Sequence, residues 1–93
     1  MKAIWKYPLP VSVSFPLLLP KGAEVLSVQV QGGHPLNNQA VLWAFVDTEL
    51  PKVMRKFSIF ATGEEVEESD DLEYVGTWQS KGFVWHLFEV MPA

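Results

Sequence analysis

The chain of 93 residues contains no cysteine. This absence excludes disulfide bonds, thiolate metal sites and a cysteine nucleophile, and it fits a reducing cytoplasm. Long apolar runs are also missing, because no segment approaches the roughly 20 apolar residues that span a bilayer. Pro8 and Pro10 interrupt the N-terminal segment before a signal-peptide core could form. We therefore expect a cytoplasmic protein with no membrane association.

Uninterrupted helical stretches are scarce as well, because prolines break most of the sequence. The seven prolines are Pro8, Pro10, Pro16, Pro20, Pro35, Pro51 and Pro92. What the chain does have is apolar material: 48% of its residues are hydrophobic, 13% are aromatic and four are tryptophan. A large aromatic side chain buries on the order of 150–250 Å², so a small core is feasible and apolar surface is left for a partner.

Between the prolines, apolar and polar residues alternate with a period of two, which is typical of strands. The expected strands are Lys2–Tyr7, Val11–Leu17, Glu24–Gln31, Gln39–Asp47, Arg55–Thr62, Leu72–Gln79 and Phe83–Val90. Turn residues separate them, and we see no repeat or linker. We predict a single domain over residues 1–93, all-β, a small antiparallel β-sandwich or barrel of about seven strands.

Local details follow from the same pattern. Leu26, Val28 and Val30 are expected to face the interior together, because they alternate with polar residues. Pro16 lacks a backbone N–H, so its strand is expected at a sheet edge or beside a bulge. The segment 48–54 is expected to be a connector with room for one helical turn. Residues 80–82 are expected to form a three-residue hairpin loop ending in glycine.

Two predicted strands, Gln39–Asp47 and Phe83–Val90, are apolar on both faces. A two-layer domain of this length covers one face of each strand internally. Covering the second faces then calls for a neighbouring subunit. We therefore expect a homo-oligomer, with a dimer as the commonest outcome.

His86 is the first candidate for chemistry. Its strand places it on one face with Val84 and Phe88, so we expect a structural histidine that donates one hydrogen bond across the sheet. The alternative is a pocket-lining residue that meets a ligand. A catalytic pair with Asp47 would require the fold to bring the two together, and the chain has no G-x-S-x-G elbow. His34 is the only other histidine, and no metal-ligand spacing occurs. We expect no enzymatic activity, no metal and no cofactor.

Acidic residues are concentrated in one segment, with seven of them inside residues 64–73. The rest of the chain has four acidic and seven basic residues, so its balance is mildly basic. The segment is expected to be a solvated loop. An alternative is a strip that mimics nucleic-acid phosphates in a basic groove of another protein. The partner-binding candidates are Glu64, Glu65, Glu67, Glu68, Asp70 and Asp71.

Four tryptophans are many for so small a core, so some are expected at a pocket wall or an interface. Aromatic faces with nearby cations suit a nucleotide, because the base stacks and the phosphate is neutralised. The ligand-binding candidates are Trp5, Lys6, Arg55, Trp78, Trp85 and His86. Polymeric nucleic acid fits less well, because basic residues are few and the acidic loop repels it.

Several segments resemble a family of short, uncharacterised proteins found largely in bacteriophage and prophage genomes. The segments are Ile4–Leu9, Leu19–Gln29, Leu42–Asp47, Thr62-Gly63, Val75–Thr77 and Phe83–Glu89. Where relatives read T-G-H, this chain reads Thr62-Gly63-Glu64, so no histidine role is carried over there. The resemblance implies a domain of unknown function, phage origin and cytoplasmic expression, and it implies no activity.

Three functional hypotheses follow. The first is a non-enzymatic phage protein that sequesters a nucleotide signal of bacterial immunity in aromatic pockets of an oligomer. The second is an inhibitor that binds a host or defence protein through the acidic loop. The third is a structural accessory domain without a ligand.

Overall fold

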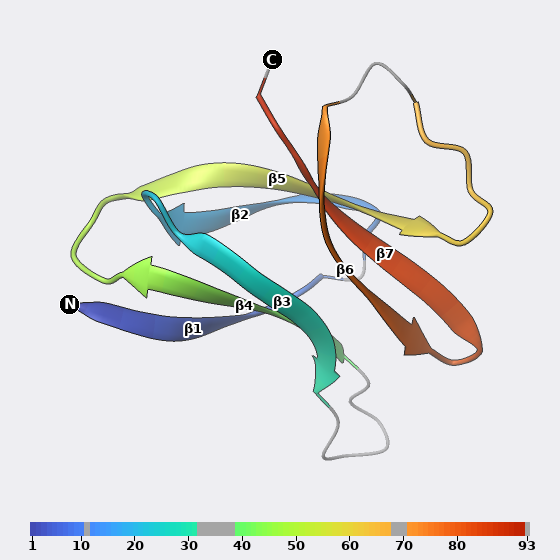
Figure 1. The fold of residues 1–93 in the computed structure, drawn as a ribbon, viewed down its shortest axis with the longest axis horizontal. Coiled ribbons are helices and arrows are strands. Elements are labelled where there is room, and N and C mark those ends of the chain that lie inside the picture. The colour runs from blue at the N-terminus through green and yellow to red at the C-terminus, as the bar shows by residue number, and fades with distance from the viewer. Residues whose placement is uncertain (11, 32–38, 68–70, 93) are drawn as a thin grey trace.

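The computed structural model of the chain describes residues 1–10, 12–31, 39–67 and 71–92. Its secondary structure there consists of strands and turns (Figure 1). The strands are β1 (Lys2–Pro8), β2 (Ser14–Pro20), β3 (Glu24–Gln31), β4 (Gln39–Asp47), β5 (Lys52–Ala61), β6 (Leu72–Ser80) and β7 (Phe83–Val90).

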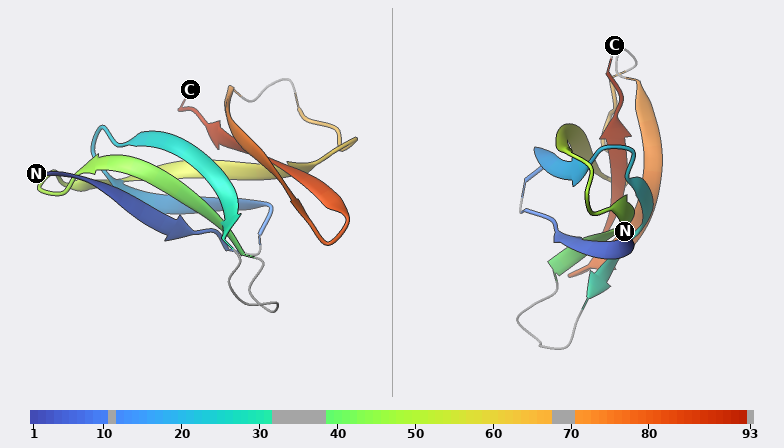
Figure 2. Two further views of the ribbon diagram at one scale, coloured as in Figure 1. Left: turned by 60° about the horizontal axis from the view of Figure 1, so that its bottom comes forward. Right: turned by 90° about the vertical axis from the view of Figure 1, so that its left-hand side faces the viewer.

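The strands form two sheets, and every hydrogen-bonded pair is antiparallel. The three-stranded sheet has the order β1-β4-β3 and the four-stranded sheet has the order β2-β5-β7-β6. Figures 1 and 2 show the two sheets stacked, with the β6–β7 hairpin projecting beyond the ends of β1 and β4. The prediction of an all-β, antiparallel sandwich or barrel of about seven strands is confirmed, and the two separate sheets make it a sandwich.

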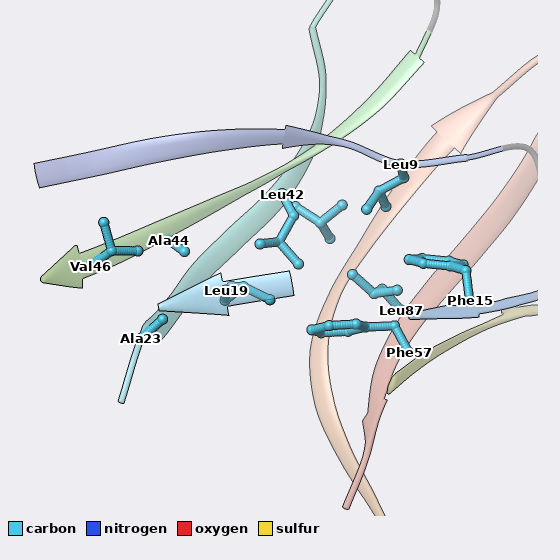
Figure 3. Packing of buried hydrophobic residues seen from close by; sticks show 10 residues of the cluster. Leu9, Phe15, Leu19, Ala23, Leu42, Ala44, Val46, Phe57 and Leu87 are labelled. Atoms are coloured by element: carbon cyan, nitrogen blue, oxygen red, sulfur yellow. The ribbon is translucent and has the colours of Figure 1, made fainter. Parts of the chain in front are cut away.

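The core lies between the sheets, where alternate residues of the strands point inward. Phe15 of β2 stacks on Phe57 of β5 with 6.0 Å between ring centroids, and Leu87 of β7 is fully buried beside them (Figure 3). The buried cluster is Leu9, Phe15, Leu19, Ala23, Val28, Leu42, Ala44, Val46, Phe57 and Leu87.

β2 begins later than the pattern predicts. The expected strand Val11–Leu17 starts at Ser14 in the structure, and position 11 lies outside the described residues. A local turn precedes it, because the N–H of Ser12 donates to the carbonyl of Pro10 (2.9 Å). Val13 is therefore 67% exposed, not part of the inward row. β2 is an edge strand, as its proline predicts.

A β-bulge in β3 makes one expectation wrong. The bounds of the strand are as predicted, but the register shifts between Val25 and Ser27. The extra residue reverses the alternation, so Leu26 is 46% exposed while Val25 and Val28 pack inward. A pattern of alternating residues gives no signal for such an insertion.

The connector expected at residues 48–54 is shorter, and it contains no helical turn. Asp47 closes a tight turn, because its carboxylate accepts from the N–H of Glu49 (3.1 Å) and its carbonyl accepts from Leu50 (3.2 Å). The hydrogen bond from Glu49 and the nearby amino terminus and Lys2 hold the pKa of Asp47 below its ordinary value. β5 then starts at Lys52, three residues before the predicted position.

The β6–β7 hairpin has a two-residue turn, and the expected three-residue loop is wrong. Ser80 pairs with Phe83, which leaves Lys81 and Gly82 as the turn. Both have positive φ, 52° and 83°, as a type I′ turn requires. Glycine meets this requirement easily, whereas Lys81 adopts it at a steric cost.

The two sheets touch closely where β6 passes β3. A Cβ added at Gly76 would lie 2.7 Å from Cγ1 of Val28, a buried residue of β3. Gly76 adjoins the bulge of β6, where the pairing with β7 shifts between Tyr74 and Gly76. The absence of a side chain at this position therefore sets how closely the sheets approach.

We predict that Gly76→Ala destabilises the protein by about 1–3 kcal/mol, because it overpacks this contact. Adding Val28→Ala should recover about 1 kcal/mol relative to the sum of the two single changes, since it removes the clashing methyl group. Urea unfolding followed by tryptophan fluorescence measures both effects. Gln79→Ala, an exposed change on the same strand, is the control and should shift stability by less than about 0.5 kcal/mol. Strict additivity of Gly76→Ala and Val28→Ala would contradict the contact.

Candidate functional site: an aromatic cleft between the sheets

A cavity of about 520 Å³ opens between the two sheets beside the β6–β7 hairpin. Its size falls in the range of small-molecule sites, about 300–1,000 Å³. We call it the aromatic cleft. The described residues that line it are Leu9, Pro10, Ser12, Val13, Gln39, Ala40, Ile59, Trp78, Ser80, Lys81, Phe83 and Trp85.

The wall formed by the hairpin carries three aromatic side chains. Trp78 and Trp85 are directly paired across β6 and β7, so both point to the same side of the sheet. Phe83 lies two residues before Trp85 on that side, and their rings are 5.7 Å apart and inclined by 37°. Phe83 is 60% exposed, while Trp78 also packs against the core. The wall is thus anchored at one end and open to a ligand at the other.

The opposite wall comes from β4 and the segment after β1, whereas Ile59 of β5 extends the hairpin's own sheet. Leu9 and Ile59 add apolar surface to the cleft. Gln39 fixes the edge of the opposite wall because its Nε2 donates to the carbonyl of Leu9 (3.1 Å). Within the described residues, the side-chain oxygen of Gln39 accepts no hydrogen bond. The cleft therefore combines apolar walls with polar groups at the rim.

Lys81 is the one charged side chain among the described lining residues. The hairpin turn holds it at the tip between β6 and β7, at the mouth of the cleft. Ser12 and Ser80 provide hydroxyls on the same lining. An aromatic wall beside a single cation favours a flat ligand that carries a negative group.

Two of the predicted ligand-binding residues, Trp78 and Trp85, come together in this cleft. Trp5 does not, because it lies on the inner face of β1 and packs against the core. Lys6 lies on the outer face of the three-stranded sheet, where it donates to Gln31 (2.9 Å) and sits 6.0 Å from the centroid of the Trp43 ring.

Arg55 lies at a second cavity, of about 440 Å³, beside the turn between β2 and β3. Its Nε and Nη2 donate to the two carboxylate oxygens of Glu89 (2.6 and 2.7 Å), and its Nη1 donates to the carbonyl of Ala23 (2.6 Å). The hydrogen bonds to Glu89 raise the pKa of Arg55 above its ordinary value, although burial opposes this. Arg55 thus joins β5, β7 and the β2–β3 turn, and Glu89 already occupies its anion-binding edge.

His86 lies on the outer face of the four-stranded sheet and lines neither cavity. Its Nε2 is 2.7 Å from the hydroxyl of Thr62 and its Nδ1 is 2.9 Å from the hydroxyl of Thr77. The hydroxyl of Tyr74 is 2.6 Å from that of Thr77. The ring thus makes hydrogen bonds to β6 and to the end of β5, which supports the structural role.

The proposed catalytic partner of His86 is elsewhere. Asp47 is at the end of β4, on the other sheet, where it faces the amino terminus and Lys2. Among residues 1–10, 12–31, 39–67 and 71–92, no group of three or more histidine and carboxylate side chains is placed to hold a metal ion. The described part of the chain also has no helix long and apolar enough to cross a membrane.

The partner-binding candidates that the structure describes lie along the connection between β5 and β6. Glu64, Glu65, Glu67 and Asp71 are exposed, and one carboxylate oxygen of Glu64 accepts from the N–H of Ala61 (3.1 Å). The other two partner-binding candidates, Glu68 and Asp70, lie outside the described residues.

Sequence reasoning missed Phe83 and Lys81 as site residues. The signal that could find them is the two-residue turn: Lys81-Gly82 places Ser80 opposite Phe83 and hence Trp78 opposite Trp85. A three-residue loop would shift this pairing and separate the aromatic rings.

The protein is thus a small antiparallel β-sandwich that has an aromatic cleft between its two sheets. The chain belongs to the family described as Domain of unknown function (DUF7352), whose model matches residues 1–93. The resemblance to a family of unknown function is thus confirmed over the whole chain. No curated protein and no solved structure matches the chain.

We predict that Glu89→Leu destabilises the protein by about 3 kcal/mol, because it leaves the half-buried guanidinium of Arg55 without its partner. The double change Arg55→Leu/Glu89→Leu should cost much less than the sum of the two single changes. Urea unfolding measures the cycle. Lys2→Met is the matched control, since it removes an exposed ion pair with Asp47 and should cost at most about 0.5 kcal/mol. A double variant as unstable as the sum would show that the pair is not coupled.

Proposed function

We propose that this protein is a non-enzymatic binding protein that holds a small nucleotide in the aromatic cleft. The observation that carries the proposal is the cluster of Trp78, Trp85 and Phe83 beside Lys81, around a cavity of about 520 Å³. The base stacks on the aromatic wall, and the phosphate meets the ammonium group at the mouth.

The chemistry of the cleft matches the parts of such a ligand. Stacking of a base on an aromatic side chain is worth about 1–3 kcal/mol and tolerates any base, because every base has a π-face. Gln39, Ser12 and Ser80 offer donors and acceptors for base edges and sugar hydroxyls. One lysine supplies too little charge for a polymer, so a mononucleotide or cyclic nucleotide is the better match.

The lining residues support binding without turnover. Within the described part of the cleft there is no carboxylate and no histidine, so no general base stands beside Ser12 or Ser80. His86, the one described histidine, is on the opposite side of its sheet. The ligand would be retained, as a sequestering protein requires.

The biological setting of the proposal comes from the resemblance to phage and prophage proteins. A non-enzymatic protein of phage origin, expressed in the host cytoplasm, would protect the phage by withdrawing a nucleotide signal of bacterial immunity. Its effect would then depend on its abundance and on ligand residence time, not on catalysis.

One observation favours a second candidate, an inhibitor of a host or defence protein. Glu64, Glu65, Glu67 and Asp71 are all exposed along a single connection, where their charge is available to a basic partner. Replacing these four residues with serine or asparagine should then abolish a salt-sensitive capture of that partner. If capture of the partner were unchanged, the acidic loop would be excluded as the binding segment.

The nucleotide proposal is tested by thermal unfolding with a panel of mononucleotides and cyclic nucleotides at about 1 mM. A ligand at 100 times its Kd stabilises the native state by about 2.7 kcal/mol, which corresponds to a rise in Tm of 10 °C or more for a domain of this size. Phe83→Ala should weaken binding at least about tenfold. Lys81→Asn, which tolerates positive φ, should weaken nucleotides but not the parent nucleosides.

Matched controls lie on the other sheet. Ile4→Ala removes a side chain as exposed as Phe83, 60% in both cases, and Lys6→Asn removes a cation beside an aromatic ring. Neither substitution should change the affinity of the protein for nucleotides. If no nucleotide raises the Tm, or if the controls weaken binding as much as the cleft variants do, the proposal fails.

A further inference from the structure

The four-stranded sheet has an outer face, the side turned away from β1, β3 and β4. Strand register defines its members, because cross-strand partners share a side. The outer face consists of Ser14, Pro16, Leu18 and Pro20 of β2, Lys52, Met54, Lys56, Ser58 and Phe60 of β5, Val84, His86, Phe88 and Val90 of β7, and Leu72, Tyr74, Thr77 and Gln79 of β6.

This face is unusually apolar for a surface in contact with water. Leu18 is 56% exposed, Met54 62% and Tyr74 58%, and they lie on three different strands. Between them, Phe88 makes edge-to-face contacts with Phe60 (5.8 Å) and Tyr74 (5.5 Å). Lys52 and Lys56 are the two charged side chains in the set, and their aliphatic stems can lie along the sheet while the ammonium groups reach water.

The histidine of the face and the hydroxyl groups beside it have partners within it. Thr77, His86 and Thr62 form a continuous hydrogen-bonded chain that ends at the hydroxyl of Tyr74. Burying unpaired polar groups is costly, whereas burying groups that keep their hydrogen bonds is not. This face can therefore be covered without leaving these donors and acceptors unsatisfied.

The outer face of the three-stranded sheet differs in this respect. Lys2 and Lys6 each lie 6.0 Å from the centroid of an aromatic ring, those of Phe45 and Trp43. Two cations of the chain thus lie over the two aromatic rings of β4, while Ile4 of β1 stays 60% exposed. Two strands were expected to need cover on their second face. Lysines lie over aromatic rings of β4, whereas no cation–ring contact is found on the described part of β7.

The available area matches what a dimer needs. Four strands about 4.8 Å apart and about 25–30 Å long present a footprint of roughly 500 Å², and projecting side chains enlarge the accessible area beyond it. A standard interface buries about 800 Å² per partner.

We infer that a second copy of this chain covers the outer face of the four-stranded sheet and forms a two-fold symmetric dimer. A self-complementary sheet face with low charge suits an isologous contact, because the same patch is used twice. The aromatic cleft lies on the other side of the hairpin, so both subunits keep their clefts open.

Sedimentation of the full chain at about 100 μM tests the dimer. The wild-type protein should sediment at about 21 kDa, twice the chain mass of 10.5 kDa. Tyr74→Glu and Met54→Glu, tested separately, should each raise the dissociation constant at least about 100-fold, since each dimer would bury two new carboxylates. Both positions are exposed in one subunit, so the circular dichroism of the monomeric variants should stay close to wild type, and their Tm should fall only by the stabilisation that dimer formation gives the wild type.

Ile4→Glu is the matched control, because Ile4 is 60% exposed on the outer face of the other sheet and receives the same substitution. It should leave the dimer intact, and so should the cleft variant Phe83→Ala. A monomeric wild-type protein at 100 μM would overturn the inference. So would a dimer that survives both face variants, or one that Ile4→Glu dissociates as strongly.

Discussion

The alternation of side chains along β7 is the constraint on which the rest of the structure depends. Its inward row places Trp85 in the cleft, Leu87 in the core and Glu89 against Arg55. Its outward row holds His86 and Phe88 on the outer face. A shift of one residue would exchange the two rows, moving the carboxylate outward and the histidine into the core. The packed core and the ion pair therefore keep the aromatic cleft and the outer face in place together.

Much of the fold follows from the sequence, because burial in a two-layer sheet imposes a period of two. The bounds of β3, β4 and β7 and the inward rows of β1 and β5 match the pattern. The bulge in β3, the early start of β5 and the two-residue turn of the hairpin do not. Each depends on a single backbone position, and local hydrogen bonds or a neighbouring strand decide it, not the hydrophobic pattern.

The candidate site was less accessible from the sequence, for a geometric reason. Aromatic and cationic residues are spread over both faces of both sheets, and only three-dimensional pairing decides which of them meet. Arg55 and Lys6 satisfy their charge or hydrogen bonds within the fold, whereas Lys81 stands at the mouth of the aromatic cleft. Sequence analysis grouped Trp78 and Trp85 with Lys6 and Arg55, and the structure places these two cations outside the cleft.

The position of β7 in its sheet has a consequence for how the protein is made. β7 is the last of the seven strands in the chain, yet it lies between β5 and β6 and hydrogen-bonds to both. Translation at about 5–20 residues per second releases the other six strands first. Until β7 emerges, β6 lacks its partner and the apolar edge of β5 is open. Folding of the four-stranded sheet must therefore wait for β7, with an interval in which nascent chains are exposed to chaperones and to one another.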